Sequence, residues 1–220
     1  WDVHAYIIAP ILEKFCSESQ KQEWLPKMVS GESILAIGLT EPGGGSDLKE
    51  LRTSAVGDGG EFVVNGSKTF ITNGHIADYV LLAAKTAPEL GAKGVSLFML
   101  DLTLPGVSRG RNLKKIGNKA QDTAELFFEN VRVPASKMVG SLNQGWEILM
   151  DGLVQERLVV AVRSAVLAEV AVDQTIEYTK TRRAFGQTVF DFQNTQFKLA
   201  EMSADVEAAR PFVDRCIELH

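Results

Sequence analysis

Residues 39–47 read LTEPGGGSD and follow an apolar run, residues 34–39, that predicts a β-strand. Pro42 and the successive glycines after it require a turn, because proline fixes φ and glycine adopts backbone angles closed to other residues. Bare backbone N–H groups there, with the hydroxyls of Thr40 and Ser46 beside them, suit a phosphate, a pyrophosphate or the polar edge of a heterocycle. An ordinary surface turn is the alternative, since the stretch matches neither GxGxxG nor a Walker loop.

The composition is that of a globular protein with a sizeable core. The chain has 220 residues, 45% of them hydrophobic and 23% charged, and its formal net charge is -5. No apolar run reaches the roughly 18 residues that a membrane span needs, and there is no basic tract or signal peptide, so we predict neither a nucleic-acid partner nor a membrane span. Because the chain begins at Trp1 without a methionine and ends at His220 inside a helical pattern, we expect a fragment.

The cysteines and histidines do not predict a metal site. Cys16 and Cys216 stand far apart without metal-ligand or redox spacing, and we expect two reduced thiols packed as small apolar groups. His4, His75 and His220 are equally scattered, so no metal is expected.

The hydrophobic period changes twice along the chain. Residues 1–30 have apolar side chains at helical spacing and predict two or three short helices, with Pro10 as an interruption. From residue 32 to about residue 133, short β-rich runs alternate with Gly, Asn and Asp turns, which predicts a small antiparallel barrel or sandwich. The predicted strands are residues 53–57, 61–64, 68–72, 79–85, 95–100 and 125–131, with hairpin signals at Asp58-Gly59-Gly60 and Asn65-Gly66.

The last third of the chain returns to a helical period. Residues 145–183 predict one long helix, which Phe185-Gly186-Gln187 then ends with a glycine. Residues 192, 199, 206 and 213, interleaved with 195, 202, 209 and 216, form the a/d seam of a further helix. A helix with such a seam needs partner helices, so we expect missing helices, another subunit, or both.

Several motifs together resemble the acyl-CoA dehydrogenase family, in order and spacing over essentially the whole chain, and most closely its long-chain type. They are TEPGGGSD at 40–47, FITNG at 70–74, KAQDTAELFFENVRVP at 119–134, QERL at 155–158 and RRAFGQ at 182–187.

The resemblance implies an α+β multidomain fold with an antiparallel β-barrel middle domain. Residues 1–31 would be the end of an N-terminal helical domain, residues 32–135 the barrel, and residues 136–220 the incomplete start of a C-terminal helical bundle. It also implies FAD held between barrel and bundle in a homo-oligomer, usually a homotetramer.

The resemblance assigns cofactor-binding residues in the barrel. Thr40 and Thr72 would donate hydrogen bonds to the flavin edge, with the backbone of residues 37–46 around the ring and pyrophosphate. Phe70 would cover one flavin face, where the family more often has Trp; a core-packing role for Phe70 and Ile71 is the structural alternative. The residues assigned to the cofactor here are Ile37, Leu39, Thr40, Gly45, Ser46, Phe70, Ile71 and Thr72.

By the same resemblance, Arg182, Phe185 and Gln193 would reach FAD bound mainly by a neighbouring subunit. The active site would then depend on the oligomer. An arginine at a helix end also interacts favourably with the helix dipole, which is the structural alternative.

Glu156 would be the catalytic base. Dehydrogenation across Cα and Cβ of a thioester requires a base near the α-proton and a hydride acceptor near Cβ. In the long-chain and isovaleryl types the base lies on the first long helix, at the position of Glu156, whereas most relatives carry it later in the bundle. The alternative is a glutamate favoured by the helix dipole. Ser46, Gln155 and Arg157 would contact the substrate.

The resemblance implies FAD-dependent oxidation of long-chain acyl-CoA to trans-2-enoyl-CoA in β-oxidation, with electrons passed to an electron-transferring flavoprotein. The alternatives are an acyl-CoA oxidase, which lets oxygen reach the flavin, and a non-catalytic binding protein of the same fold. The expected location is the cytoplasm in a bacterium or the mitochondrial matrix in a eukaryote, and not a secreted protein.

Overall fold

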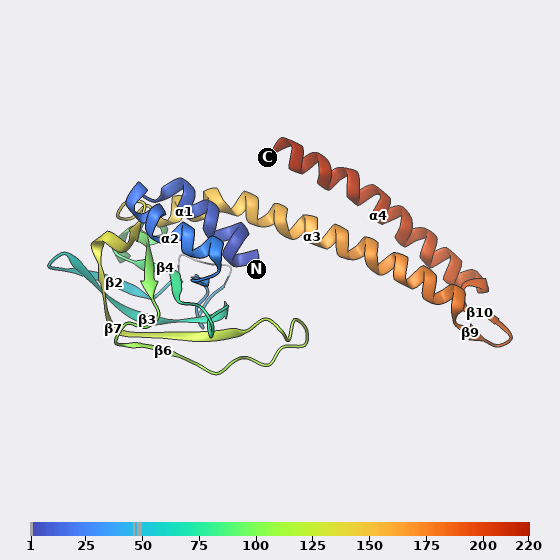
Figure 1. Cartoon of the computed structure of the whole chain (residues 1–220), viewed down its shortest axis with the longest axis horizontal. Coiled ribbons are helices and arrows are strands. Elements are labelled where there is room, and N and C mark those ends of the chain that lie inside the picture. The colour runs from blue at the N-terminus through green and yellow to red at the C-terminus, as the bar shows by residue number, and fades with distance from the viewer. Residues whose placement is uncertain (1, 46, 48–49) are drawn as a thin grey trace. The chain divides into compact units, whose positions relative to one another are not determined.

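The computed structural model describes residues 2–45, 47 and 50–220. The chain forms two compact units, Trp1–Leu153 and Val154–His220. The first unit combines short helices with a β-sheet, and the second consists of long helices joined by a small hairpin (Figure 1). The division into three domains at residues 31 and 135 stays a prediction.

Short helices open the first unit, as predicted. The π-helical turn η1 (Val3–Ile8) runs directly into α1 (Ala9–Phe15), and Pro10 occupies the first turn of α1, where a missing N–H leaves no helical bond unmade. The helix α2 (Glu18–Ser30) begins with a capping box, in which Ser17 and Gln20 satisfy each other's backbone N–H groups. It ends at Gly31, whose φ of 76° is a left-handed C-cap.

The sheet has eight strands in the order β6-β7-β3-β2-β4-β5-β8, with β1 added alongside β4. The strands are β1 (Leu35–Gly38), β2 (Ser54–Asp58), β3 (Glu61–Thr72), β4 (Tyr79–Lys85), β5 (Val95–Asp101), β6 (Val107–Arg109), β7 (Thr123–Pro134) and β8 (Met138–Val139). Short 3₁₀ turns, η3 (Pro88–Gly94) and η4 (Ala135–Lys137), lie between them.

The prediction of an antiparallel barrel is only partly right. Most neighbours pair antiparallel, but β1 and β2 both pair parallel with β4, so the sheet is mixed. The β2–β3 hairpin lies between β1 and β4 in the chain, which lets β4 return beside β1 in the same direction. Among the described residues the outer strands β6 and β8 do not pair with each other, so no closed barrel is found.

One hairpin signal is confirmed and the other is wrong. Asp58 pairs with Glu61 across the predicted Gly59-Gly60 turn. Asn65-Gly66, in contrast, lies inside β3, where the register with β7 shifts between Val64 and Gly66. From Val64 to Gly66 the strand β3 advances two residues while β7 advances three, so the extra residue of the bulge lies in β7, and the two runs predicted on either side of Asn65-Gly66 are one strand.

The central strands are buried on both faces. In β4, Leu81 belongs to one core cluster and its neighbours Val80 and Leu82 to the other. The first cluster joins the sheet to η1, α1, α2 and the start of α3, and the second joins β3, β4, β5 and β7. Figure 1 shows α1 and α2 lying over one face of the sheet. Each fully buried Leu, Ile or Val in these clusters contributes about 1.5–3 kcal/mol of transfer free energy.

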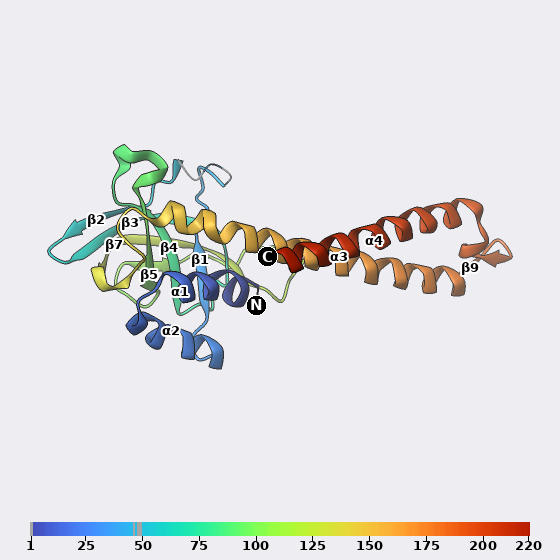
Figure 2. The ribbon, with the colours of Figure 1, turned by 90° about the horizontal axis from the view of Figure 1, so that it is seen from above.

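Two long antiparallel helices form the second unit (Figure 2). The helix α3 (Gly145–Thr181) begins in the first unit, and α4 (Gln193–Leu219) follows the hairpin of β9 (Arg183–Ala184) and β10 (Gln187–Thr188) and the 3₁₀ turn η5 (Val189–Asp191). Leu199 and Val213, both in the predicted seam, are the buried apolar residues of α4.

The chain between α3 and α4 differs from its prediction. Gly186 does not cap a helix, because α3 already ends at Thr181. Phe185 and Gly186 instead form the turn of the β9–β10 hairpin, with φ of 51° and 83°.

In the part of the chain that the structure describes, no helix combines the length and the apolar character that crossing a membrane requires.

Candidate functional site

The glycine-rich turn is tightly closed, as the sequence predicts. Glu41 and Gly44 exchange two backbone hydrogen bonds of 3.1 Å, with Pro42 and Gly43 at the corner. A Cβ added at Gly43 would meet nothing within 4 Å, so the backbone at this corner is open to an approaching ligand. Gly45, the next predicted cofactor residue, is exposed.

The predicted residues that precede the turn lie against β3. Ile37, in β1, and Leu39 and Thr40, which follow it, are half-buried. The backbone N–H of Thr69 donates to the carbonyl of Thr40 at 2.9 Å, which joins the start of the turn to β3. Ser46, assigned to both cofactor and substrate, lies outside the described residues.

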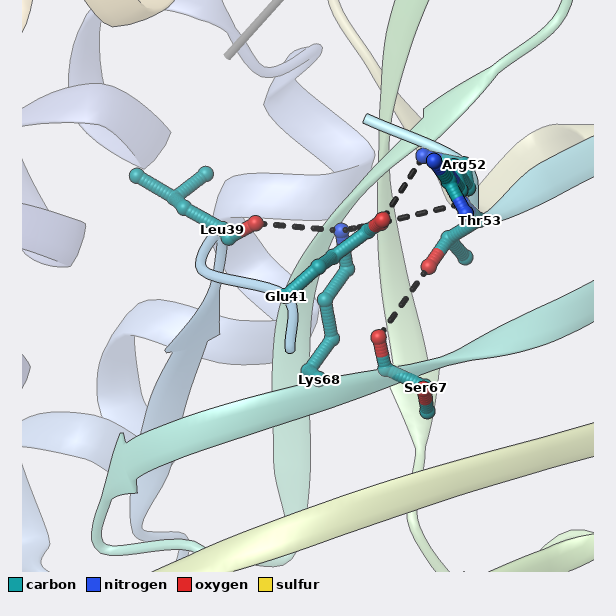
Figure 3. A network of polar contacts seen from close by, with 6 residues as sticks. All are labelled: Leu39, Glu41, Arg52, Thr53, Ser67 and Lys68. Carbon is teal, nitrogen blue, oxygen red and sulfur yellow. Dashed lines mark hydrogen bonds and ion pairs between the residues drawn. The ribbon is translucent and has the colours of Figure 1, made fainter. Parts of the chain in front are cut away.

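A buried ion pair connects the turn to β3. Lys68, in β3, is 0% exposed, and its Nζ donates to Glu41 Oε1 at 2.8 Å and to the carbonyl of Leu39 at 3.2 Å. The Glu41 carboxylate also accepts from the backbone N–H of Arg52 at 2.7 Å and of Thr53 at 2.9 Å. Figure 3 shows these groups converging on one point between the turn and β3.

Both members of the pair are charged at neutral pH. Burial raises the pKa of Glu41, but the hydrogen bond and charge of Lys68, with the donors at Thr53 and Arg52, outweigh it and hold the pKa below its ordinary 4.5. Burial lowers the pKa of Lys68 to about 8, although Glu41 opposes that shift.

Phe70 lies at a bulge in β3. The register with β7 shifts between Lys68 and Ile71, and Phe70 has a φ of 57°. This conformation costs a non-glycine residue about 1–3 kcal/mol, and such strain is typical of functional sites. The Phe70 side chain is 67% exposed, which contradicts the core-packing alternative for this residue. Ile71, by contrast, is 3% exposed and packs in the second core cluster, so only its backbone is open to a ligand.

Thr72 is oriented by a residue that the sequence did not single out. Gln121 Nε2 donates to Thr72 Oγ1 at 2.9 Å. Because the hydroxyl oxygen accepts this bond, its own proton remains for a second partner. Thr72 is half-buried at the end of β3 and is therefore suited to donate to a bound ligand.

The predicted base and substrate residues lie on α3, within the second unit. Glu156 is half-buried, and burial raises its pKa above the ordinary value, against the lowering effect of Arg157. Arg157 itself is exposed. Gln155 Oε1 lies 3.5 Å from Nε2 of His220, which joins α3 to the end of α4.

The last predicted group lies around the β9–β10 hairpin. Arg182 and Gln193 are exposed, and the Phe185 side chain is 98% exposed. Phe185 packs edge-on against Phe192, with ring centroids 6.5 Å apart. The exposed ring and guanidinium are available to contact another molecule.

The described residues contain no group of three or more His, Cys, Asp or Glu side chains placed to hold a metal ion. Cys16 and Cys216 are both free, as expected, and Cys16 is buried. Burial raises the pKa of the Cys16 thiol to about 12, so it is protonated and unreactive at neutral pH.

Sequence reasoning missed Lys68, Glu41 and Gln121. For Lys68 a signal was present, because residues 64, 66 and 68 share one face of a strand and Val64 is apolar. A lysine on the buried face of a strand requires a buried partner.

Models of three domains from one family match nearly all of the chain. The N-terminal domain of acyl-CoA dehydrogenases matches residues 1–32, the middle domain residues 36–131 and the C-terminal domain residues 143–220.

Individual relatives agree with these models. The long-chain specific acyl-CoA dehydrogenase of Sus scrofa is 46% identical over 100% of this chain and 52% of its own length, so the chain spans about half of that relative. The structure of an acyl-CoA dehydrogenase from Geobacillus kaustophilus is 49% identical with a TM-score of 0.96 and covers 98% of this chain and 57% of that one. A chain in a structure of the electron transferring flavoprotein of Acidaminococcus fermentans is 38% identical with a TM-score of 0.89, over 94% of this chain and 55% of that one. The three consecutive domain matches, together with this identity over the full chain, place the protein in the acyl-CoA dehydrogenase family.

Proposed function

We propose that this chain is part of an FAD-dependent enzyme that oxidises long-chain acyl-CoA to trans-2-enoyl-CoA in β-oxidation. The observation that carries the proposal is the strained and exposed Phe70, which follows the residue bound to the turn at Thr40 and precedes by two residues the oriented hydroxyl of Thr72. The substrate class follows the relative from Sus scrofa, which is named for long-chain acyl-CoA.

The residues of the first unit fit a flavin by their chemistry. An exposed aromatic face suits stacking against a flat ring, and the open backbone of the glycine turn suits a pyrophosphate or the polar edge of the ring. The Thr72 hydroxyl has a proton to donate, because Gln121 already occupies its oxygen. Bound FAD would supply a hydride acceptor, which no side chain of the protein can provide.

Glu156 is the proposed base. It takes the proton from the α-carbon of the thioester, while the hydride leaves the β-carbon, and the substrate becomes the trans-2-enoyl-CoA. The raised pKa of Glu156 brings the carboxylate closer in basicity to the working pH, which favours proton abstraction. Gln155 and Arg157 beside it are proposed substrate contacts.

The proposed partners are a neighbouring subunit and an electron-transferring flavoprotein. Arg182, Phe185 and Gln193 are exposed and are proposed to contact FAD of a neighbouring subunit in a homotetramer. An electron-transferring flavoprotein is the proposed electron acceptor, in line with the similarity to a chain from such a system. A bacterial cytoplasm or a mitochondrial matrix is the proposed location.

Colour tests the proposed function directly. We expect purified full-length protein to be yellow and to bleach when a long-chain acyl-CoA is added under nitrogen. Bleaching followed by oxygen consumption without an added acceptor would identify an oxidase instead. Colourless protein that cannot be reconstituted with FAD would contradict the proposed function and support the alternative of a non-catalytic binding protein.

The Glu156→Gln variant tests the base. Because it removes the proposed base while preserving the shape of the side chain, we expect flavin content near that of the wild type and turnover lower by a factor of about 10⁴. Glu177→Gln is the matched control, since it makes the same change at an exposed position of α3 and should retain activity. Turnover in Glu156→Gln close to that of the wild type would assign the base to another residue.

A further inference from the structure

The Lys68–Glu41 pair is unusual for its depth. Its side chains are 0% and 8% exposed, whereas Lys14–Asp151, Arg132–Asp58 and Arg210–Glu169 are ion pairs in which both partners are more than a third exposed. Burying two charges costs several kcal/mol of desolvation per ion, and their attraction often only offsets it, so a buried pair is weak evidence for a gain in stability. A pair at this depth is better explained by what it holds in place.

What the pair holds is the backbone on both sides of Thr40. A single ammonium group binds the carbonyl of Leu39 at 3.2 Å and the carboxylate of Glu41 at 2.8 Å, which are the two neighbours of Thr40 in sequence. The carbonyl of Thr40 itself accepts from Thr69 N–H at 2.9 Å. Three consecutive residues are therefore fixed to two adjacent residues of β3.

The bulge in β3 makes this attachment possible. At Thr69 and Phe70 the register with β7 shifts, so the Thr69 N–H is free of the ladder and donates to the turn instead. The same short segment thus positions Phe70, through its backbone, and Thr40, through Lys68 and Thr69. The Glu41 carboxylate also accepts from the backbone N–H groups of residues 52 and 53. The pair therefore also fixes the backbone directly before β2.

We propose that Lys68 and Glu41 are positioning residues that hold Thr40 and the glycine turn in the geometry that binds the flavin. This inference rests on the proposed function, because it gives the pair a role toward FAD. Without the Lys68 ammonium, the carbonyl of Leu39 and the carboxylate of Glu41 lose their shared donor. The bond from Thr69 then remains as the direct restraint on the Thr40 backbone, and the Leu39 side of the turn has lost its donor. The flavin edge would meet a hydroxyl of variable position, which lowers affinity and changes the polarity around the ring.

The test compares full-length wild type with Lys68→Met, Glu41→Gln and the double variant, all at a temperature where circular dichroism shows them folded. FAD affinity is measured by flavin fluorescence, and the visible absorption bands of bound flavin report its surroundings. We expect at least tenfold weaker FAD binding and shifted bands in each variant. The double variant leaves no unpaired buried charge, so it should melt at a higher temperature than either single variant and still bind FAD weakly.

Ile11→Ala is the matched control for a loss of stability alone. Ile11 is 1% exposed in the first core cluster and belongs to α1, so its truncation lowers stability while every hydrogen bond of the Lys68–Glu41 pair stays in place. We expect this variant to bind FAD with wild-type affinity and with unshifted bands.

The outcomes separate the two proposals. Wild type that binds FAD, with folded variants of the same affinity and spectrum, would overturn the positioning role alone. Weak binding in Ile11→Ala equal to that in the double variant would also overturn it, because the effect would then be one of stability. Wild type that takes up no FAD would contradict the proposed function and this inference with it.

Discussion

The Glu41 carboxylate is charged in a buried place because its donors outweigh its desolvation. Lys68, Thr53 and the backbone N–H of Arg52 together hold its pKa below 4.5 in the folded chain, against the raising effect of burial. The unfolded chain therefore binds more protons than the folded chain in the pH range between the two pKa values. It follows that this carboxylate contributes stability above its unfolded pKa, and that the contribution is lost as the pH falls through the folded pKa.

The pH dependence of the stability of Glu41→Gln tests whether folding lowers the pKa of Glu41. At pH 7 we expect the free energy of unfolding to be lower than that of the wild type by about 3–5 kcal/mol, because Lys68 is left buried without a charged partner. On acidification below about pH 4.5, the wild type should lose stability more steeply, so that the gap narrows. Urea titrations at a series of pH values measure both quantities.

Asp58→Asn is the control at the residue scale. Asp58 pairs with Arg132, but both side chains are more than half exposed, so the change should cost no more than about 1 kcal/mol. A gap that stayed constant from pH 7 to acid, or equal effects of the two substitutions, would contradict the assignment of a depressed pKa to Glu41.

At the scale of elements, two bulges shape the pairing of β3 with β7. The first has its extra residue in β7, and beside it Gly66 lets β3 lie close to Thr53. The second has its extra residue in β3, near Phe70, and attaches β3 to the glycine turn. A continuous ladder would satisfy more of its own backbone groups but would leave none for the turn. The second bulge therefore makes this part of β3 available to the candidate site.

Gly66→Ala tests the close approach of β3 to Thr53. Gly66 has a φ of 150°, and an added Cβ would lie 2.6 Å from the Cα of Thr53, so the backbone of one segment or the other must move. We expect a loss of roughly 3 kcal/mol in the free energy of unfolding. Gly57→Ala, in the adjacent β2, is the control, since the added Cβ would meet Phe62 at an ordinary 3.8 Å and should change stability by less than about 1 kcal/mol. Equal chemical denaturation midpoints for the two variants would show that β3 tolerates a side chain at position 66 beside Thr53.

At the scale of the whole molecule, FAD that binds the folded protein and not the unfolded chain should raise the free energy of unfolding. A ligand present at 100 times its dissociation constant adds about 2.7 kcal/mol to the free energy of unfolding. We expect the thermal midpoint of the full-length apoprotein to rise steadily with the logarithm of the FAD concentration. Riboflavin lacks the pyrophosphate and adenosine, so it should raise the midpoint less. A midpoint independent of FAD concentration would contradict the proposed cofactor.

The sequence by itself determined the features that depend on local backbone preference and on hydrophobic period. Pro42 and the glycines required the turn, Gly59-Gly60 required the hairpin, and helical spacing predicted α2, α3 and α4. The ordered motifs also identified the family, because several short segments in register are a specific signal even where each alone is weak. The pattern at Asn65-Gly66 was misleading, since these residues continue β3 as one strand and the extra residue of the bulge beside them lies in β7.

Only the tertiary structure decided which strands pair and which polar groups meet inside the sheet. The parallel pairing of β1 with β4 depends on chain segments more than 40 residues apart, and no local preference specifies it. The Lys68–Glu41 pair and the Gln121–Thr72 hydrogen bond likewise join residues that are distant in sequence. Lone charged or amide side chains look like surface residues until the fold buries them, because the free-energy cost of burial, and so the need for a partner, arises only when the surrounding chain excludes water.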